Sequence, residues 1–134
     1  MFRLGTDIVH IPRIQMAIER FGDRFKQRVY TPAEQLDCGW GKNSPSRATI
    51  NSLAGRWAAK EAVVKALGTG WRGVGYTDIE ILRGDCGVPL VHLHGRAMIV
   101  TVAPEAHWQL SLSHDGDYAI ATALLICLPK PQSL

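Results

Sequence analysis

Apolar and polar residues follow two periodicities along this chain, one typical of strands and one typical of helices. Apolar, β-branched or alternating runs predict strands at 2–11, 78–83, 88–94, 108–114 and 118–128. Apolar residues at helical spacing, with capping signals, predict helices at 12–21, at 32–37 and over a long central segment that begins near 47–51 and ends at Leu67. We expect one domain over 1–128 and a tail at 129–134.

The segments between these elements carry turn signals. Gly84-Asp85-Cys86-Gly87 lies between two alternating runs and predicts a hairpin. The segment 38–46 contains two glycines and a proline and predicts a loop. The segment 95–106 fits two structures, because its β-branched run favours a strand whereas its position between strands suits a helix. The tail PKPQSL predicts a frayed end.

The central helix carries charges in an unusual place. Its apolar arc comprises Leu53, Trp57, Val63, Val64 and Leu67. Arg56 and Lys60 project from inside this arc, although an amphipathic helix normally keeps its charges on the opposite side. Cations in such a position suggest a buried or interfacial anionic ligand. The alternative is that Arg56 and Lys60 snorkel to solvent and that Glu61 and Lys65 form a surface pair.

The residues after this helix form a glycine-rich loop, GTGWRGVG. Gly68 stands where a left-handed helix cap is expected, and Gly70 leaves the loop free to approach a ligand. The loop lacks the spacing of a nucleotide-binding fingerprint, so alone it is weak evidence for a phosphate site. Its position directly after a helix with Arg, Lys and Glu residues favours a wall for phosphates.

Two carboxylates interrupt otherwise apolar elements. Asp7 lies within the first strand and Glu61 within the central helix, so the two meet if these elements pack together. Magnesium is usually held by one or two carboxylates with substrate phosphates and water. Together with nearby cations, Asp7 and Glu61 describe a metal-assisted phosphoryl-transfer site. His114 ends a strand before a turn, where a structural role and a role in a site are both reasonable.

Cations also recur along the first helical region, at Arg13, Arg20, Arg24 and Arg28. Such a run is typical of a solvated helix face. It would equally suit a strongly acidic protein partner, because basic patches speed encounter and fix orientation.

Composition narrows the class of protein further. The 134 residues carry a formal net charge of only +3, which argues against disorder and against a general nucleic-acid binder. No segment approaches the ~20 apolar residues of a membrane span, and no signal peptide precedes the first strand. The three cysteines are widely spaced and indicate neither a disulfide framework nor a zinc site. We expect a protein of the reducing cytoplasm.

Four stretches of this sequence resemble the bacterial holo-acyl-carrier-protein synthases, the short-chain trimeric type of 4′-phosphopantetheinyl transferase. They are GTDIVHIPRI, LAGRWAAKEAVVKALGTG, DIEI with a following G-x-P, and SLSHDGDYAIATALL. They occur in the family's order and spacing and cover nearly the whole chain.

The resemblance implies an α+β fold in which an antiparallel sheet packs on a long central helix. It also implies a reaction, the transfer of 4′-phosphopantetheine from coenzyme A to a serine of apo acyl carrier protein, which releases adenosine 3′,5′-bisphosphate and supports fatty acid biosynthesis. By position, Asp7 and Glu61 would be ligands of Mg²⁺, and Lys65 would neutralise charge on the phosphates.

The remaining implied contacts concern coenzyme A, the carrier and the assembly. Coenzyme A would contact Arg56, Lys60, Lys65, Gly68, Thr69, Gly70 and His114. The arginines Arg13, Arg20, Arg24 and Arg28 would dock the acidic carrier protein. The family assembles as a homotrimer with active sites between subunits, so Asp7 and Glu61 of one chain would act with residues of the next.

The resemblance implies an in-line attack with two candidate proton acceptors. The carrier serine would attack the β-phosphate in line, with either a metal-held water or a carboxylate as proton acceptor. His10 stands where relatives commonly carry glutamate, so that carboxylate is missing here. A non-catalytic module that binds coenzyme A or a nucleotide is the alternative, although it would not need two metal ligands. A basic protein-interaction domain would leave the charges of the central helix unexplained.

Overall fold

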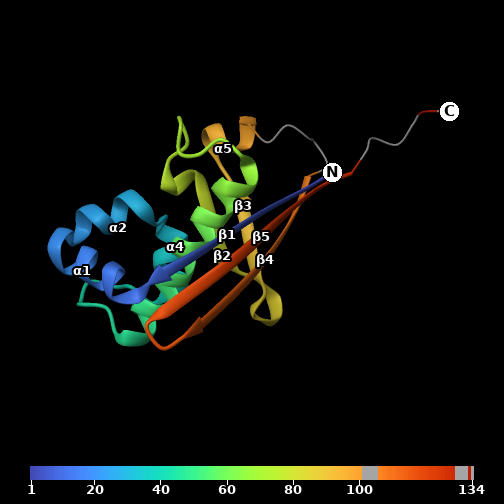
Figure 1. Ribbon diagram of the computed structural model, residues 1–134. Coiled ribbons are helices and arrows are strands. Elements are labelled where there is room, and N and C mark those ends of the chain that lie inside the picture. The colour runs from blue at the N-terminus through green and yellow to red at the C-terminus, as the bar shows by residue number, and fades with distance from the viewer. Residues whose placement is uncertain (101–105, 129–132, 134) are drawn as a thin grey trace.

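The protein is described by a computed structural model over residues 1–100, 106–128 and 133, with only the backbone considered at 99 and 100. Its elements, shown in Figure 1, are β1 (Phe2–His10), α1 (Ile11–Phe21), α2 (Asp23–Val29), α3 (Pro32–Cys38), α4 (Arg47–Leu67), the short 3-10 helix η1 (Tyr76–Asp78), β2 (Ile79–Arg83), a second 3-10 turn η2 (Asp85–Gly87), β3 (Pro89–Leu93), α5 (Gly95–Val100), β4 (Ala106–Asp115) and β5 (Tyr118–Cys127). The expected α+β fold is confirmed.

The main sheet is antiparallel and has the strand order β1-β5-β4. Alternate residues of each strand face α4, and the central strand β5 presents Ala119, Ala121 and Ala123, all nearly or fully buried. These small side chains let the long helix lie close to the sheet. The approach is closest at Gly5 of β1, where an added Cβ would fall 1.9 Å from the carbonyl oxygen of Ala62.

The central helix α4 has well-defined ends. The Ser46 side chain accepts a hydrogen bond from the backbone N–H of Thr49, which caps the N-terminus. Gly68 adopts a left-handed conformation and closes the C-terminus, as expected from the sequence. Most of the helix is buried because it contacts the sheet on one side and the hairpin and the N-terminal helices on others.

The three short helices α1, α2 and α3 follow β1 and cover one end of α4 (Figure 1). The predicted capping box begins α3: the Glu34 N–H donates to the Thr31 hydroxyl, and the Thr31 N–H donates to the Glu34 carboxylate. Glu34 is fully buried, which a capping residue alone does not require.

The predicted hairpin is the second sheet, in which β2 pairs with β3. In the segment 95–106 the structure forms the helix α5 over Gly95–Val100, so the helical alternative is confirmed for these residues; 101–105 lie outside the described residues, and Ala106 begins β4. The predicted frayed tail at 129–134 also lies outside the described residues, apart from Ser133.

Along β1 and β5, the side of the main sheet that faces away from α4 is mostly apolar and open to solvent, whereas β4 carries His107, Gln109, Ser111 and Ser113 on that side. It includes Phe2, Leu4, Ile8, Tyr118 and Ile120, which are 42–72% exposed. Across β1 and β5 these residues lie in register, as in the pairs Leu4 with Leu124 and Ile8 with Ile120. Within the described residues, no helix is long and apolar enough to span a membrane.

Candidate functional site

Asp7 and Lys65 meet where β1 lies against the last turns of α4. Lys65 Nζ contacts Asp7 Oδ1 at 3.1 Å and the backbone oxygen of Thr6 at 2.9 Å. The Lys65 side chain is 53% exposed and that of Asp7 is 18% exposed, so this ion pair borders solvent. Asp7 occupies the helix-facing side of its strand, which is why a carboxylate in an apolar run can reach α4.

Glu61 lies one helical turn before Lys65, and aromatic groups hold its carboxylate. The Tyr76 hydroxyl is 3.3 Å from Glu61 Oε1, and Trp71 Nε1 is 3.4 Å from Oε2. Burial, followed by the charge and hydrogen bond of Glu61, raises the pKa of Tyr76 to about 12, and Asp7 contributes in the same direction. Both carboxylates therefore act on the same hydroxyl group, which keeps its proton at neutral pH and donates.

The predicted glycine-rich loop begins directly beyond this pair. Gly68 and Gly70 both have positive φ, and no atom lies within 4 Å of a Cβ built at Gly70. The loop is therefore open at Gly70. Arg3 Nη1 donates to the carbonyl oxygen of Leu67 at 2.9 Å and so ties the helix end to β1.

Lys60 lies in a different environment from Lys65, although both belong to α4. Its ammonium group donates to Glu34 Oε1 at 2.7 Å, to the Tyr76 carbonyl at 2.8 Å and to the Ile79 carbonyl. The side chain has no exposed surface. A fully enclosed ammonium cannot contact coenzyme A, so the predicted contact at Lys60 is corrected to a structural role. The anion that pairs with Lys60 inside the apolar arc of α4 is therefore the Glu34 carboxylate of the same chain.

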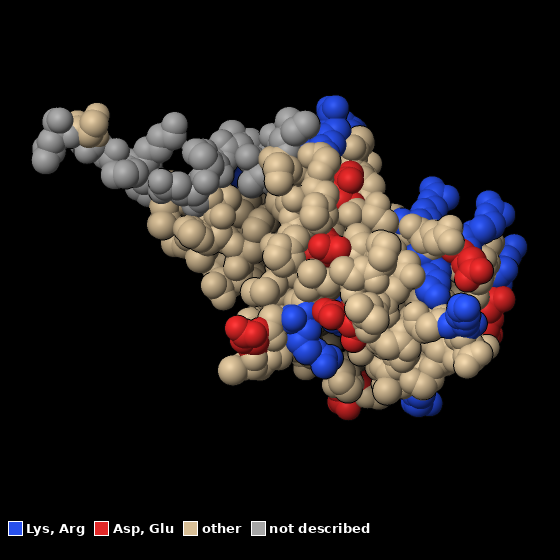
Figure 2. All heavy atoms as spheres, turned by 180° about the vertical axis from the view of Figure 1, so that it is seen from behind, with Lys and Arg blue, Asp and Glu red and all other residues tan. Residues whose placement is uncertain are grey.

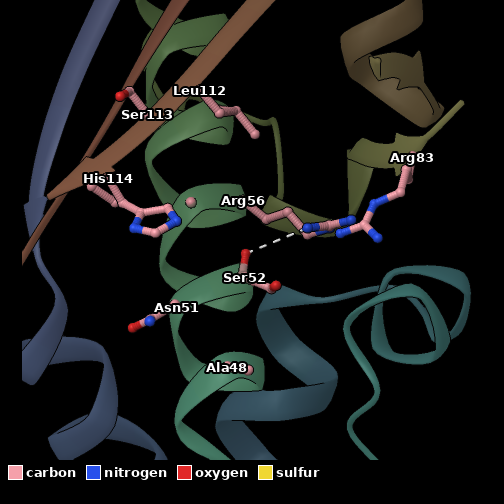
Figure 3. A pocket seen from close by; sticks show the side chains of 10 residues that line it. Ala48, Asn51, Ser52, Arg56, Arg83, Leu112, Ser113 and His114 are labelled. Carbon is pink, nitrogen blue, oxygen red and sulfur yellow. Dashed lines mark hydrogen bonds between the residues drawn. The ribbon is translucent and has the colours of Figure 1, made fainter. Parts of the chain in front are cut away.

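Arg56 and His114 line a cavity of about 430 Å³ on the β4 side of α4. Arg56 is only 6% exposed; its Nε donates to the Ile81 carbonyl at 3.1 Å, and Nη2 lies 3.8 Å from Asp37 Oδ2. Figure 3 shows Arg56 entering the cavity from α4, Arg83 from β2 and His114 from β4. The cavity is thus lined by two guanidinium groups and an imidazole, a set suited to an anion.

The sheet and α4 separate this cavity from the Asp7 and Glu61 carboxylates. Asp7 belongs to β1, one edge strand, and His114 to β4, the other edge strand, with β5 and the packed helix between them. The structure therefore places the predicted site residues in two groups, one on each side of α4. One chain alone does not bring them together.

The four predicted docking arginines lie together on α1 and α2. Arg13, Arg20, Arg24 and Arg28 are all exposed, and Figure 2 shows basic side chains gathered at this end of the molecule. Beside Arg24 and Arg28 the surface is mostly apolar: a cavity of about 370 Å³ is lined by Phe21, Arg24, Phe25, Arg28, Val29, Trp57 and Tyr76. This surface joins basic and aromatic groups.

Asp7 and Glu61 are the candidate ligands for a hard cation such as Mg²⁺. Among the described residues, no three His, Cys, Asp or Glu side chains form a complete metal-binding group. Magnesium does not require one, since it commonly uses one or two protein carboxylates and takes its other ligands from water and substrate phosphates. Asp7 and Glu61 are carboxylates that could hold Mg²⁺ in this way, and the Lys65 ammonium lies 3.1 Å from Asp7 Oδ1.

The fold and this site define a class of protein. The chain matches the model of the 4′-phosphopantetheinyl transferase superfamily over residues 3–123, and it belongs to that family. It is 56% identical over 127 residues to a holo-[acyl-carrier-protein] synthase of Gloeobacter violaceus, with 94% of this chain and 93% of that protein covered. It is 43% identical over 129 residues to the synthase of Herpetosiphon aurantiacus, with 90% and 95% covered.

Solved structures agree with this assignment. The ACPS–CoA complex of Chronobacterium ammoniagenes has a TM-score of 0.78 and 32% sequence identity, covering 96% of this chain and 99% of that one. The Helicobacter pylori holo-[acyl-carrier-protein] synthase in complex with coenzyme A has a TM-score of 0.77 and 31% identity, covering 92% and 99%. The resemblance found in the sequence motifs is confirmed.

Sequence reasoning missed the residues that support the site. Glu34 was expected only as a capping residue, because a capping box does not reveal whether its glutamate is buried. Trp71 and Tyr76 lie in and after the glycine-rich loop, where no periodicity indicates which way a side chain points. The only available signal was the presence of large aromatic residues in a loop otherwise rich in glycine.

Proposed function

We propose that this protein transfers 4′-phosphopantetheine from coenzyme A to a serine of an apo acyl carrier protein and releases adenosine 3′,5′-bisphosphate. The observation that carries the proposal is the grouping of Asp7, Glu61 and Lys65 beside an open glycine loop. Its support is membership in a family whose relatives are named holo-[acyl-carrier-protein] synthase. This activity would supply holo carrier protein for fatty acid biosynthesis.

We infer that Asp7 and Glu61 hold Mg²⁺, which when bound neutralises the charge of the coenzyme A pyrophosphate. Lys65 adds a cation at the same place, and its exposed ammonium is available to phosphate oxygens. The Oγ–P bond to the carrier serine forms as the bond from phosphorus to the bisphosphate oxygen breaks, and the proton of the serine hydroxyl passes to a water molecule or a carboxylate. Lys65 would stabilise the negative charge that develops on the leaving bisphosphate.

We further infer that the complete site forms between subunits of a homotrimer. Two observations support this inference: the Arg56–His114 cavity lies across α4 from the carboxylates, and the outer face of β1 and β5 exposes large apolar residues. Packing of these faces would bury Phe2, Leu4 and Ile8. It would let the cavity of one chain complete the carboxylate site of the next, and Arg56, His114 and the loop residues Gly68, Thr69 and Gly70 would then contact coenzyme A.

The basic surface of α1 and α2 is the proposed docking site for the acidic carrier protein. Its arginines would orient the carrier by charge, and the aromatic groups between them would receive an apolar side chain. We place the reaction in the cytoplasm, where coenzyme A and carrier protein are both accessible. The competing function, a non-catalytic coenzyme A-binding module, shares the cavity but does not account for the two carboxylates.

Intact-mass measurement of an apo acyl carrier protein tests the proposal. Incubation with this protein, coenzyme A and Mg²⁺ should add one phosphopantetheine, and a chelator should prevent the gain. Glu61→Gln should lower the rate by orders of magnitude. Glu80→Gln, the same change in a carboxylate on β2, should leave the rate unchanged. Binding of coenzyme A without mass gain on several carriers would instead establish the binding module.

Mixing two inactive variants tests the shared site. Glu61→Gln and His114→Ala chains, refolded or expressed together in equal amounts, should regain about a quarter of wild-type activity, because that share of interfaces would pair an intact Glu61 with an intact His114. Each variant alone should stay inactive or strongly impaired. A mixture no more active than the separate variants would refute a site between subunits while leaving the reaction itself in place.

A further inference from the structure

Both carboxylate oxygens of Glu61 have an aromatic hydrogen-bond donor from outside α4. Tyr76, on η1, approaches Oε1 at 3.3 Å, and Trp71, in the glycine-rich loop, approaches Oε2 at 3.4 Å. Two donors on different oxygens fix the rotation of the carboxylate plane. Each oxygen has a second lone pair, which remains available to a cation.

Tyr76 is itself held at three points. Its ring lies between two indoles, with centroids 4.8 Å from Trp57 and 4.1 Å from Trp71. Its backbone oxygen accepts from Lys60 Nζ at 2.8 Å. Lys60 is fixed in turn by the buried carboxylate of Glu34. The hydroxyl group therefore projects from a rigid support.

The two proposed metal ligands differ in how much support they need. Asp7 has a short side chain on a strand and is paired directly with Lys65 at 3.1 Å. Glu61 has one more rotatable bond, so ordering its side chain costs more conformational entropy. Groups that orient a metal-ligating carboxylate reduce this cost at the moment of binding.

We propose that Tyr76 is a positioning residue that orients the Glu61 carboxylate for the metal, with Trp71 as its second support. This inference rests on the proposed role of Glu61 as a ligand of Mg²⁺. Tyr76 acts through Glu61 and does not itself touch the metal. The aromatic cluster thus links the buried core around Lys60 to the partly buried Glu61 carboxylate.

Tyr76→Phe is the decisive variant, because it keeps the stacked ring and removes only the hydroxyl group. The probe is Mn²⁺, titrated against the protein with coenzyme A present and followed by the electron paramagnetic resonance signal of free Mn²⁺. We expect the Kd for Mn²⁺ to rise about tenfold, since partners of metal ligands typically contribute 10–100-fold and these contacts are at the long end of hydrogen-bond distances. Trp71→Phe should give a smaller rise.

Tyr30→Phe is the matched control. The Tyr30 hydroxyl donates to the Leu53 carbonyl at 2.8 Å inside the core. Its loss should lower the unfolding temperature without changing the Kd for Mn²⁺. Equal Mn²⁺ affinity of Tyr76→Phe and wild type would overturn the proposal, as would an affinity loss in Tyr30→Phe of the same size.

Kinetics and Glu61→Gln separate this inference from the proposed function. In transfer assays Tyr76→Phe should raise the half-saturating Mg²⁺ concentration about tenfold, with kcat at saturating Mg²⁺ within about twofold of wild type. Glu61→Gln should abolish Mn²⁺ binding. If it does so while Tyr76→Phe has no effect, only the positioning role fails. If wild type and Glu61→Gln bind Mn²⁺ alike, the metal role of Glu61 and the positioning role fail together.

Discussion

Two lysines of α4 pair with carboxylates from other elements, one pair inside the protein and the other beside solvent. Lys60 and Glu34 meet at 2.7 Å with both side chains fully enclosed, whereas Lys65 and Asp7 meet at 3.1 Å with side chains 53% and 18% exposed. The Lys60 ammonium uses all three of its donors within the chain. Lys65 donates to Thr6 and Asp7 and still faces solvent. A lysine of α4 can therefore bind a ligand only where internal hydrogen bonds leave its ammonium group accessible.

The buried pair has an architectural consequence. Glu34 Oε2 also accepts the Ile81 N–H at 2.9 Å, so the pair joins α3, α4 and the hairpin strand β2. Burial lowers the pKa of Lys60, and the adjacent Glu34 carboxylate opposes that effect. A buried charge that loses its partner is strongly unfavourable, whereas an exposed one is hydrated by water. Removing each lysine should thus have different effects.

Lys60→Met is expected to have the largest effect on stability. It leaves the Glu34 carboxylate buried without its cation, which should lower the free energy of unfolding by about 3–5 kcal/mol. Urea denaturation followed by tryptophan fluorescence measures this loss. A loss of less than about 1 kcal/mol would mean that the backbone donors to Glu34 suffice and that the two pairs differ less than their burial indicates.

Lys65→Met should have little effect on stability and a large effect on activity. Because the Lys65 ammonium reaches solvent and its pair with Asp7 borders water, the free energy of unfolding should change by less than about 1 kcal/mol. Transfer activity should fall roughly 10²–10³-fold, the usual result of removing one group that stabilises charge in a transition state. Parallel urea and intact-mass assays on both lysine variants test the contrast. A Lys65→Met protein that is unstable but retains its catalytic rate would reverse the roles assigned to the two lysines.

Sequence periodicity predicted most of the fold because the signals were local. The capping box at Thr31, the cap at Gly68 and the alternation in the hairpin each depend on a few neighbouring residues, and each is confirmed. The segment that forms α5 is ambiguous in sequence, because its β-branched residues favour a strand and its position between strands favours a helix. Here the helical alternative is confirmed over the described residues.

The candidate site was less accessible to sequence reasoning. Asp7 and Glu61 stood out because carboxylates are rare in apolar elements, and β1 does pack on α4 as that hypothesis required. Lys60 and Lys65 could not be told apart, since the spacing of charges on a helix does not show what packs over them. The buried partner of Lys60 comes from a helix 26 residues earlier, and no local pattern encodes that contact.

Gly5→Ala should have an intermediate effect on stability. It tests whether the close packing of β1 on α4 positions the Lys65–Asp7 pair. A Cβ at this position would lie 1.9 Å from the Ala62 oxygen and 2.8 Å from the Ala66 nitrogen, so β1 and α4 must separate. Overpacking of this kind costs about 1–3 kcal/mol. The shift should also weaken Mn²⁺ binding, because Asp7 lies two residues along the same strand. Gly41→Ala, where no atom lies within 4 Å, is the control and should be close to neutral.

The smallest expected effect concerns Glu80, at the edge of the buried network. Burial raises the pKa of this carboxyl, but hydrogen bonds from Thr31 and His94 outweigh it, and the pKa lies below its ordinary value of 4.5. A lowered folded-state pKa means that Glu80 contributes stability above about pH 4.5, and that this contribution is lost as the pH falls through the folded-state value.

Glu80→Gln should therefore be less stable than wild type by under about 1 kcal/mol at pH 7. The difference should shrink as the pH falls below about 4.5, as urea midpoints at each pH would show. If the stability difference between Glu80→Gln and wild type grew as the pH fell, burial and not hydrogen bonding would dominate the pKa of Glu80.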